Sequence, residues 1–186
     1  MAPDVAPDTG SAVLNLGFLT VAHENGGYVG AYLVTNHWGR PLEFRLSTSV
    51  QPNRIQQILY GGTLQSYICA DLIGKTLVEK TTTAAGCIFT DCEAALDLRL
   101  RVQVPVVWLA PANDPMAEDL AQEGACVPAS RRGAGTLIHH PRVPADNAVI
   151  RELLGRLEED FEFSEPFVRV REALAEARKM GVTGRA

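Results

Sequence analysis

Hydrophobic residues follow a strand-like pattern in three neighbouring segments near the start of the chain. Residues 12–21 are apolar on both alternating faces, which is typical of a central strand covered on two sides. Asn25-Gly26 favours a tight hairpin, and residues 28–36 supply the returning strand. Residues 42–50 are apolar on one face only, as expected of an edge strand. The pattern therefore predicts three antiparallel strands.

A helix and then a strand–helix–strand unit follow. Residues 63–80 carry a broad apolar stripe, which predicts a helix lying across the sheet. Two short apolar runs, 87–89 and 104–109, flank a segment with helical spacing, the pattern of parallel strands joined by a crossover helix. Because such crossovers are right-handed, we predict an α/β fold with a five-stranded mixed sheet, ordered 3-2-1-4-5, and helices on both faces.

The remainder of the chain divides into a loop and a helical end. Residues 111–135 are rich in Pro, Gly, Ala and Asp, which predicts a long loop, and residues 136–139 fit one more short edge strand. Residues 146–186 hold two segments with apolar residues at helical spacing, and these helices are expected to pack on the domain or on a partner. We therefore divide the chain into a flexible lead at 1–11, an α/β domain at 12–145 and these C-terminal helices.

Composition narrows the class of protein. The chain has 186 residues, 46% of them hydrophobic, which is enough for one buried core. Its net charge of -5 argues against a dedicated nucleic-acid binder, because affinity for phosphates comes mostly from clustered Lys and Arg. We find no apolar run of the roughly 18 residues that a spanning helix needs and no secretory signal, so we expect a cytoplasmic protein without membrane contact. The four cysteines are expected to be free thiols.

This order of elements, with the segment 88–96 (IFTDCEAAL), resembles the ribonuclease H-like superfamily over about residues 12–109. The resemblance places Asp91 where that family has a metal-binding carboxylate at the end of its fourth strand. Asp71 or Glu79 in the preceding helix would supply a second acid. The family's first strand normally carries an aspartate, whereas the first strand here has no acid. Because two-metal hydrolysis needs several converging carboxylates, the resemblance implies the fold without the nuclease chemistry.

Asp91 also has a simpler interpretation, which we favour. A carboxylate at this position would cap a helix that begins at Cys92 by accepting hydrogen bonds from free backbone N–H groups. The sequence also contains possible zinc ligands, namely Cys87, Cys92, His139 and His140. Their spacing contains no Cys-x2-Cys pair, so no metal site is predicted.

One local basic cluster is a candidate anion site. Its glycines would let backbone N–H groups approach a phosphate or a nucleic-acid strand. The alternative, which we slightly prefer, is a solvent-exposed loop that balances nearby acidic charge. The residues of this cluster are Arg131, Arg132, His139, His140 and Arg142.

The leading hypothesis is a non-catalytic accessory or scaffold domain in a multi-protein assembly. It would bind a protein partner or itself through its C-terminal helices and exposed sheet edge, without a cofactor. One alternative is a metal-dependent nuclease or related phosphoryl-transfer enzyme that uses Asp91 with Asp71 or Glu79 and needs Mg²⁺. The other is a nucleic-acid-binding module that uses the loop at residues 131–142.

Overall fold

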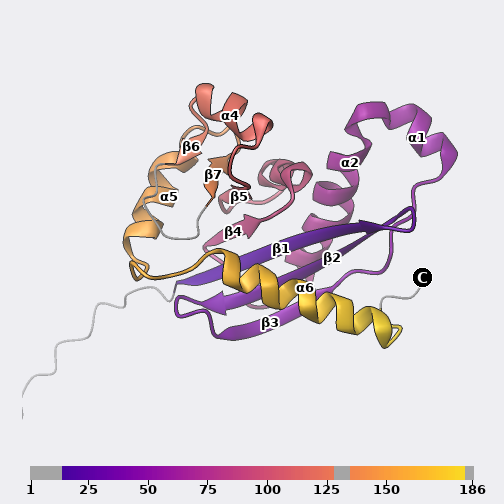
Figure 1. Cartoon of the computed structure of the whole chain (residues 1–186), viewed down its shortest axis with the longest axis horizontal. Helices are drawn as coiled ribbons and strands as arrows, with labels where there is room; N and C mark the ends of the chain where they lie inside the picture. The colour runs from indigo at the N-terminus through magenta and orange to yellow at the C-terminus, as the bar shows by residue number, and fades with distance from the viewer. Residues whose placement is uncertain (1–13, 128–134, 183–186) are drawn as a thin grey trace, which may run out of the picture.

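The computed structural model describes residues 14–127 and 135–182 (Figure 1). Within these residues, seven strands form one mixed sheet. The strands are β1 (Asn15–Glu24), β2 (Gly27–Asn36), β3 (Pro41–Leu46), β4 (Cys87–Thr90), β5 (Val106–Ala110), β6 (Cys126–Val127) and β7 (Thr136–His139). Their order across the sheet is β3-β2-β1-β4-β5-β7-β6.

Helical segments of three kinds join and cover these strands. Two are 3-10 helices, η1 and η3, and η2 is a π-helical segment continuous with the α-helices on either side of it. The segments are α1 (Arg54–Tyr60), η1 (Gly61–Thr63), α2 (Leu64–Ser66), η2 (Tyr67–Gly74), α3 (Lys75–Lys80), η3 (Glu93–Leu100), α4 (Pro115–Gln122), α5 (Asp146–Gly155) and α6 (Ser164–Lys179). Within the described ranges, every helix is too short or too polar to span a bilayer.

The sheet is larger than predicted: it has seven strands, and the five-stranded prediction is wrong. β7 pairs antiparallel with β5, and β6 pairs antiparallel with β7. β6 is only two residues long, too short to show an alternating pattern, and it lies in the segment predicted to be a loop. That segment also contains α4, whose N-cap Asp114 accepts hydrogen bonds from two backbone N–H groups and precedes a proline at the first helical position.

The central pairing of the sheet sets the geometry of the later site. β1 pairs antiparallel with β2 and parallel with β4, with Leu19 opposite Thr90. The predicted hairpin between β1 and β2 is confirmed, and its turn residues Asn25 and Gly26 both adopt positive φ angles, of 51° and 77°. Strand β1, whose one acid is Glu24 at its last position, therefore lies directly beside the strand that leads into Asp91.

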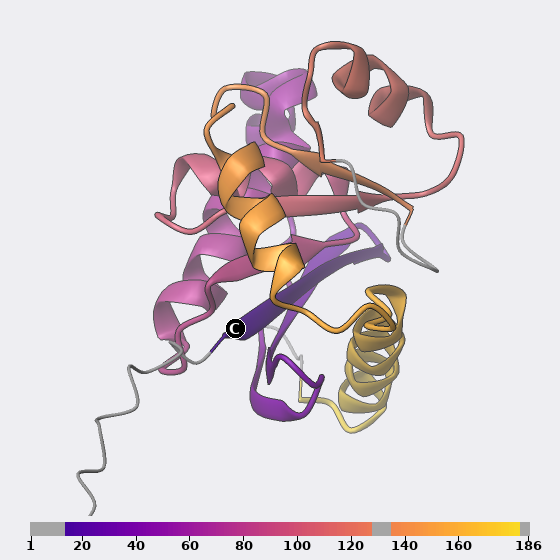
Figure 2. The same cartoon turned by 90° about the vertical axis from the view of Figure 1, so that its left-hand side faces the viewer.

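Alternate residues of the strands face two separate cores. Phe18 and Phe89 belong to a core beneath α5 and α6, whereas Leu19 and Ile88 belong to a core on the other face, beneath η2 and η3. Figure 2 shows the same division, with α6 on one side of the sheet and the helical segment at 64–80 on the other. The two-residue period of a strand thus decides which helices each side chain meets.

The last helix, α6, buries its apolar stripe against the sheet. Phe167, Val170 and Leu174 are each at most 3% exposed. The ring of Phe167 meets that of Phe18 edge to face, with centroids 5.5 Å apart. The stripe therefore completes the core, and the apolar side of α6 does not form a free surface for a partner.

Candidate nucleic-acid site at the end of strand β4

Asp91 follows β4 at the carboxyl end of the parallel strands β1, β4 and β5. It is two residues beyond Phe89, so its side chain lies on the α6 face of the sheet. On the adjacent strand, Thr20 comes one residue after the Leu19–Thr90 pair. Thr20 Oγ1 donates a hydrogen bond of 2.5 Å to Asp91 Oδ1. The group on β1 that faces Asp91 is therefore a neutral hydroxyl and not a second carboxylate.

A cation from α6 lies on the other oxygen of the same carboxylate. Arg171 Nε is 3.5 Å from Asp91 Oδ2, and it also donates a hydrogen bond of 3.2 Å to the Phe167 carbonyl one turn earlier. The burial of Phe167 fixes α6 on the sheet and thereby directs Arg171 toward the end of β4. The Arg171 side chain is 58% exposed, whereas that of Asp91 is 20% exposed. Asp91 thus lies between a hydroxyl and a guanidinium.

Folding raises the pKa of Asp91 above its ordinary value of 3.8. Burial raises the pKa of Asp91, and this effect exceeds the lowering by the Thr20 hydrogen bond and by the charge of Arg171. The ionised carboxylate is therefore only partly compensated by its two partners. Such a shifted carboxyl group in a concave site is a reason to treat the position as functional.

A pocket of about 530 Å³ opens beside this pair of residues. Its walls come from the end of β5 and from the first turns of α6, with Leu109 and Phe167 on the apolar side. Ser164, Asp91 and Arg171 supply its hydrogen-bonding side chains. Sites in open α/β sheets collect at the carboxyl ends of the strands, which is where this pocket lies.

The residues around Asp91 do not fit a pair of Mg²⁺ ions. Two-metal hydrolysis requires several carboxylates that hold the ions about 4 Å apart, whereas the neighbours of Asp91 are the hydroxyl of Thr20 and the guanidinium of Arg171. In the part of the chain that the structure describes, no three His, Cys, Asp or Glu side chains are grouped to hold a metal ion. We therefore derive no metal-assisted step at this pocket.

The two other acids considered from the sequence have partners elsewhere. Asp71 on η2 forms an ion pair with Arg101. Glu79 on α3 lies 3.8 Å from Lys75 in an exposed pair on its own helix. Both helical segments cover the face of the sheet opposite α6 (Figure 2). Neither acid takes part in the contacts described for Asp91.

The prediction that Asp91 caps the following helix is wrong. That helix is the 3-10 segment η3, which begins at Glu93 and has Cys92 as its N-cap residue. Cys92 makes no side-chain capping hydrogen bond. The Asp91 carboxylate instead accepts the hydrogen bond from Thr20, because the chain places it over the sheet and not over the start of η3.

The predicted basic cluster contains both buried and exposed residues. His139 and His140 are buried, so neither is accessible to a phosphate. The N–H of Arg142 donates to His140 Nδ1, which places the ring proton on Nε2, 3.1 Å from Asp97 Oδ1. Arg142 itself is exposed. The remaining residues of the cluster, which lie outside the described residues, are Arg131 and Arg132.

The sequence interpretation missed both partners of Asp91. Thr20 offered a signal, because it is a polar residue within the otherwise apolar run at 16–22. Arg171 offered none, since it is one of several charged residues on an amphipathic helix. Its role depends on how α6 is placed on the sheet.

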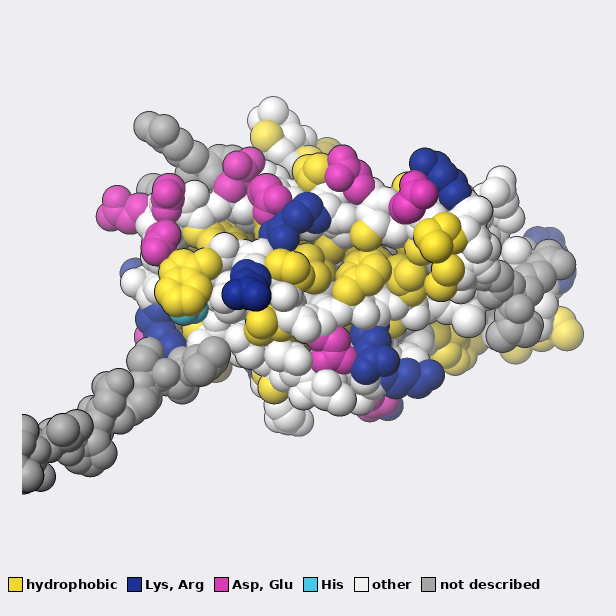
Figure 3. All heavy atoms as spheres, turned by 90° about the horizontal axis from the view of Figure 1, so that it is seen from below, with side chains coloured by type: hydrophobic (Ala, Val, Ile, Leu, Met, Phe, Trp, Pro, Cys, Tyr) yellow, Lys and Arg dark blue, Asp and Glu magenta, His cyan; other side chains and the backbone are white. Residues whose placement is uncertain are grey.

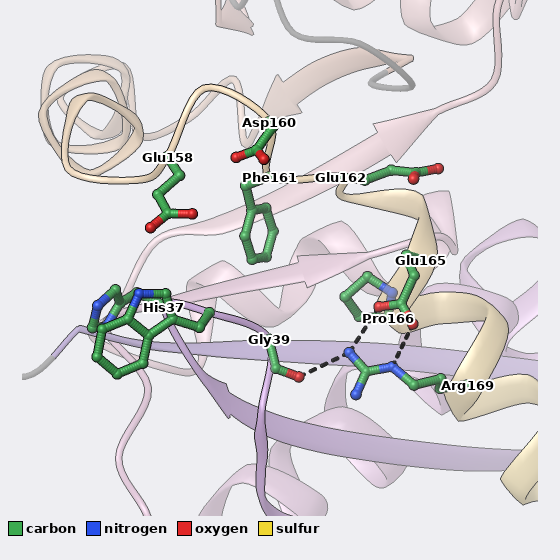
Figure 4. A pocket seen from close by; sticks show the side chains of 10 residues that line it. His37, Gly39, Glu158, Asp160, Phe161, Glu162, Glu165, Pro166 and Arg169 are labelled. Atoms are coloured by element: carbon green, nitrogen blue, oxygen red, sulfur yellow. Dashed lines mark hydrogen bonds and ion pairs between the residues drawn. The ribbon is translucent and has the colours of Figure 1, made fainter.

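A second pocket, of about 450 Å³, lies between the β2–β3 turn and the start of α6 (Figure 4). Arg169 crosses its base, pairing with Glu165 at 2.8 Å and donating a hydrogen bond of 2.9 Å to the Gly39 carbonyl. Phe161 points into it from above. The acidic side chains that line it are Glu158, Asp160, Glu162 and Glu165. This negative charge opposes a phosphate, so the pocket beside Arg171 suits a nucleic acid better.

The sheet edge formed by β3 is partly apolar and exposed. Leu42 and Phe44 are 46% and 38% exposed, and the nearby Trp38 is 68% exposed. Figure 3, viewed from below, shows a band of hydrophobic side chains with acidic side chains gathered along one side of it. A protein partner at this edge stays a prediction.

No family model and no curated protein matches the chain significantly. Several solved structures share its fold. Human ENDOV superposes with a TM-score of 0.56 at 13% identity, covering 90% of this chain and 87% of that one. Endonuclease V from Streptomyces avermitilis gives 0.51 at 14% identity, with 89% and 83% covered. Ciona intestinalis endonuclease V in complex with inosine-containing DNA gives 0.50 at 11% identity, with 89% and 87% covered. At these identities the likeness shows the fold alone, and it supports the ribonuclease H-like fold predicted from the sequence.

Proposed function

We propose that this chain binds nucleic acid through the pocket beside Asp91 and does not cleave it by a two-metal mechanism. The observation that carries this proposal is the position of Arg171, whose guanidinium lies 3.5 Å from the Asp91 carboxylate at the carboxyl end of β4. A side-chain cation thus takes the place next to the carboxylate where a nuclease of this fold would need a metal ion. The same cation is well suited to a phosphate.

The comparisons support a nucleic-acid ligand more than the accessory scaffold role that we inferred first from the sequence. The matched endonuclease V structures extend over most of the chain, and the Ciona intestinalis protein was solved with DNA. A shared fold does not transfer an activity by itself. It does favour the strand ends as the place where a nucleic acid approaches, which is where the pocket lies.

Arg171 retains donors for a ligand. Both of its contacts among the described residues use Nε, and a guanidinium carries five N–H donors in total. Its two terminal nitrogens therefore suit a bidentate contact to a phosphate. The Ser164 hydroxyl in the same pocket adds a neutral donor.

The net charge of -5 leads us to expect weak binding to nucleic acid. Among the described residues that line the pocket, Arg171 is the one cation, so few phosphates should be neutralised, binding should be weak and its dependence on salt shallow. A steep dependence would instead indicate a long basic track across the surface.

The binding test measures fluorescence anisotropy of a short fluorescein-labelled DNA with the full chain in EDTA, over a series of salt concentrations. Arg171→Gln should weaken binding and reduce the slope of log affinity against log salt by about one, the effect of losing one phosphate contact. Arg171→Lys should keep most of the slope. The matched control is Arg151→Gln, an exposed arginine on α5, which should bind as the unchanged protein does.

A double variant separates two causes of weaker binding. Arg171→Gln also exposes the negative charge of Asp91, which would repel a phosphate by itself. If that repulsion were the whole effect, adding Asp91→Asn would restore binding, and the phosphate contact would be excluded. We expect the double variant to stay weak. Absence of binding by the unchanged protein, or an equal loss in Arg151→Gln, would contradict the proposal.

The second candidate is a metal-dependent nuclease that uses Asp91. It is favoured by the position of this carboxylate in a pocket at the strand ends and by the likeness to endonuclease V. It would need further metal ligands from outside the described residues. Its distinguishing result is cleavage of DNA or RNA that requires a divalent metal and disappears in Asp91→Asn.

A further inference from the structure

Two of the four cysteines lie close together although they are far apart in the sequence. Cys69 on η2 and Cys92 at the start of η3 have their Sγ atoms 4.0 Å apart. The other two are separated from this pair: Cys87 is in the core on the α6 face of the sheet, and Cys126 is on β6 at the far edge. The fold therefore creates one thiol pair and leaves two single thiols.

The two thiols have different surroundings. Cys69 is 1% exposed, whereas Cys92 is partly exposed and is the residue through which a reagent would enter. A hydrogen bond with the Cys69 thiol lowers the pKa of Cys92, as do the backbone N–H groups of Ala95 and Ala94, and these effects exceed the raising by burial and by the charge of Asp91. The pKa of Cys69 is raised by its hydrogen bond with Cys92 and by burial. This asymmetry is that of an attacking thiolate with a resolving thiol beside it.

We propose that Cys69 and Cys92 form a redox-active dithiol that closes to a disulfide on exposure to hydrogen peroxide. The sulfur atoms need to approach by about 2 Å to reach the length of an S–S bond. Cys69 lies within a π-helical segment, a local irregularity that is frequent at functional sites. Cys92 lies at a junction between a strand and a 3-10 helix, where regular hydrogen bonding is already interrupted.

The reaction proceeds in two balanced steps. The Cys92 thiolate attacks one peroxide oxygen, so that an S–O bond forms, the O–O bond breaks, and the departing hydroxide takes a proton to become water. The Cys69 sulfur then attacks the sulfur of the Cys92 sulfenic acid, forming the S–S bond and expelling a second water that carries the Cys69 proton. Each sulfur gives up one electron, and the peroxide accepts both. A dithiol reductant reverses the result.

Formation of the disulfide would link η2 to Cys92, the residue that directly follows Asp91. These two segments already contact each other through the core beneath η2 and η3, so the bond joins neighbours within one layer. Its formation would fix the chain at the end of β4 to the helices on the opposite face from α6.

The test oxidises the full chain with a small excess of hydrogen peroxide, quenches it, and counts free thiols after unfolding. We expect the count to fall from four to two and to return to four with dithiothreitol. Peptide mapping by mass spectrometry should find residues 69 and 92 in one linked pair. Four free thiols after treatment, or a link between any other pair, would overturn the proposal without any variant.

Variants then assign the roles. Cys69→Ser should block the disulfide and leave a sulfenic acid on Cys92 that reacts with dimedone. Cys92→Ser should block both products. The matched control is Cys126→Ser, which changes a single partly exposed cysteine and should leave the disulfide intact. Loss of the link in Cys126→Ser, or dimedone labelling of Cys126 in place of Cys92, would contradict the assignment.

Discussion

Thr20 on β1 donates a hydrogen bond of 2.5 Å to the carboxylate of Asp91 at the end of β4. The two residues are separated by 71 positions in the sequence, and the parallel pairing of their strands brings them together. The group on β1 that meets this carboxylate is a hydroxyl donor and not a second acid. That donor compensates part of the cost of burying the carboxylate.

The first prediction concerns this hydrogen bond. Thr20→Val keeps the shape of the side chain and removes its donor, so the mostly buried carboxylate loses its hydrogen bond of 2.5 Å. Because hydrogen bonds to charged groups are the stronger class, the free energy of unfolding should fall by about 1.5–3 kcal/mol at neutral pH. Urea denaturation of the two proteins measures the difference.

A double-mutant cycle checks that the loss comes from this contact. In an Asp91→Asn background the acceptor is neutral, so Thr20→Val should cost less than it does in the unchanged protein. Equal costs in both backgrounds would mean that Thr20 contributes through packing and not through Asp91.

The second prediction follows from the raised pKa of Asp91. A carboxyl group whose pKa is raised by folding stabilises the fold fully below its ordinary value of 3.8, and this contribution is lost as the pH rises through the folded pKa. Asp91→Asn removes the titration. Relative to the unchanged protein, the variant should therefore become more stable as the pH is raised from acid to neutral. A relative loss of stability over that range, measured by denaturation at several pH values, would show that the ionised form is the one the fold favours.

The third prediction concerns Glu43, which ties β3 to the loop after α3. The N–H of Thr83 donates to it at 2.8 Å and is the largest cause that lowers its pKa, with Arg45 and Thr82 adding to the effect, to about 2. A lowered carboxyl pKa gives stability that is present above the unfolded value of 4.5 and is lost as the pH falls through about 2.

Glu43→Gln should thus be less stable than the unchanged protein at neutral pH, with a gap that narrows as the pH falls from 4.5 toward 2. Thermal unfolding across that range measures the gap. The control is Glu79→Gln, from an exposed ion pair, which should show little difference at any pH. A gap that does not change with pH would exclude the charge of Glu43 as its source.

The fourth prediction concerns the ion pair that joins η3 to the start of α5. Arg99 contacts Asp146 through Nε at 2.5 Å and Nη2 at 3.1 Å, and the Asp146 side chain is 5% exposed. Asp146→Asn leaves a mostly buried guanidinium without its counter-charge and should cost about 3–5 kcal/mol of unfolding free energy. Replacing both residues, as Arg99→Met with Asp146→Leu, should cost much less. Equal losses in the two variants would contradict this account.

The parts of the fold that the sequence predicted are those with local signals. Asn25-Gly26 indicated the hairpin between β1 and β2, and it is present with the expected backbone angles. The one-sided alternation in β3 indicated an edge strand, and β3 is at the edge of the sheet. The position of Asp91 after a short apolar run indicated the end of a buried strand, and β4 ends there. Each of these signals lies within a few residues of the feature it predicts.

The parts that the sequence did not predict depend on distant contacts or on very short elements. The five-strand prediction omitted β6 and β7: β6 has two residues, too few to show a period, and residues 136–139 were expected only as one more edge strand, whereas β7 lies between β5 and β6. The partners of Asp91 come from β1 and α6, and only the assembled sheet brings Thr20 and Arg171 to it. The contact of Cys69 with Cys92 likewise joins two helical segments that no spacing rule relates.

The most direct test of the central claim follows one labelled DNA with the full chain by anisotropy and by gel, in EDTA and in Mg²⁺ or Mn²⁺. We predict that binding does not require the metal ion and that the DNA stays intact in all three conditions, because Thr20 and Arg171 hold the Asp91 carboxylate without a metal ion. Fragments that appear only with the divalent metal and vanish in Asp91→Asn would contradict it.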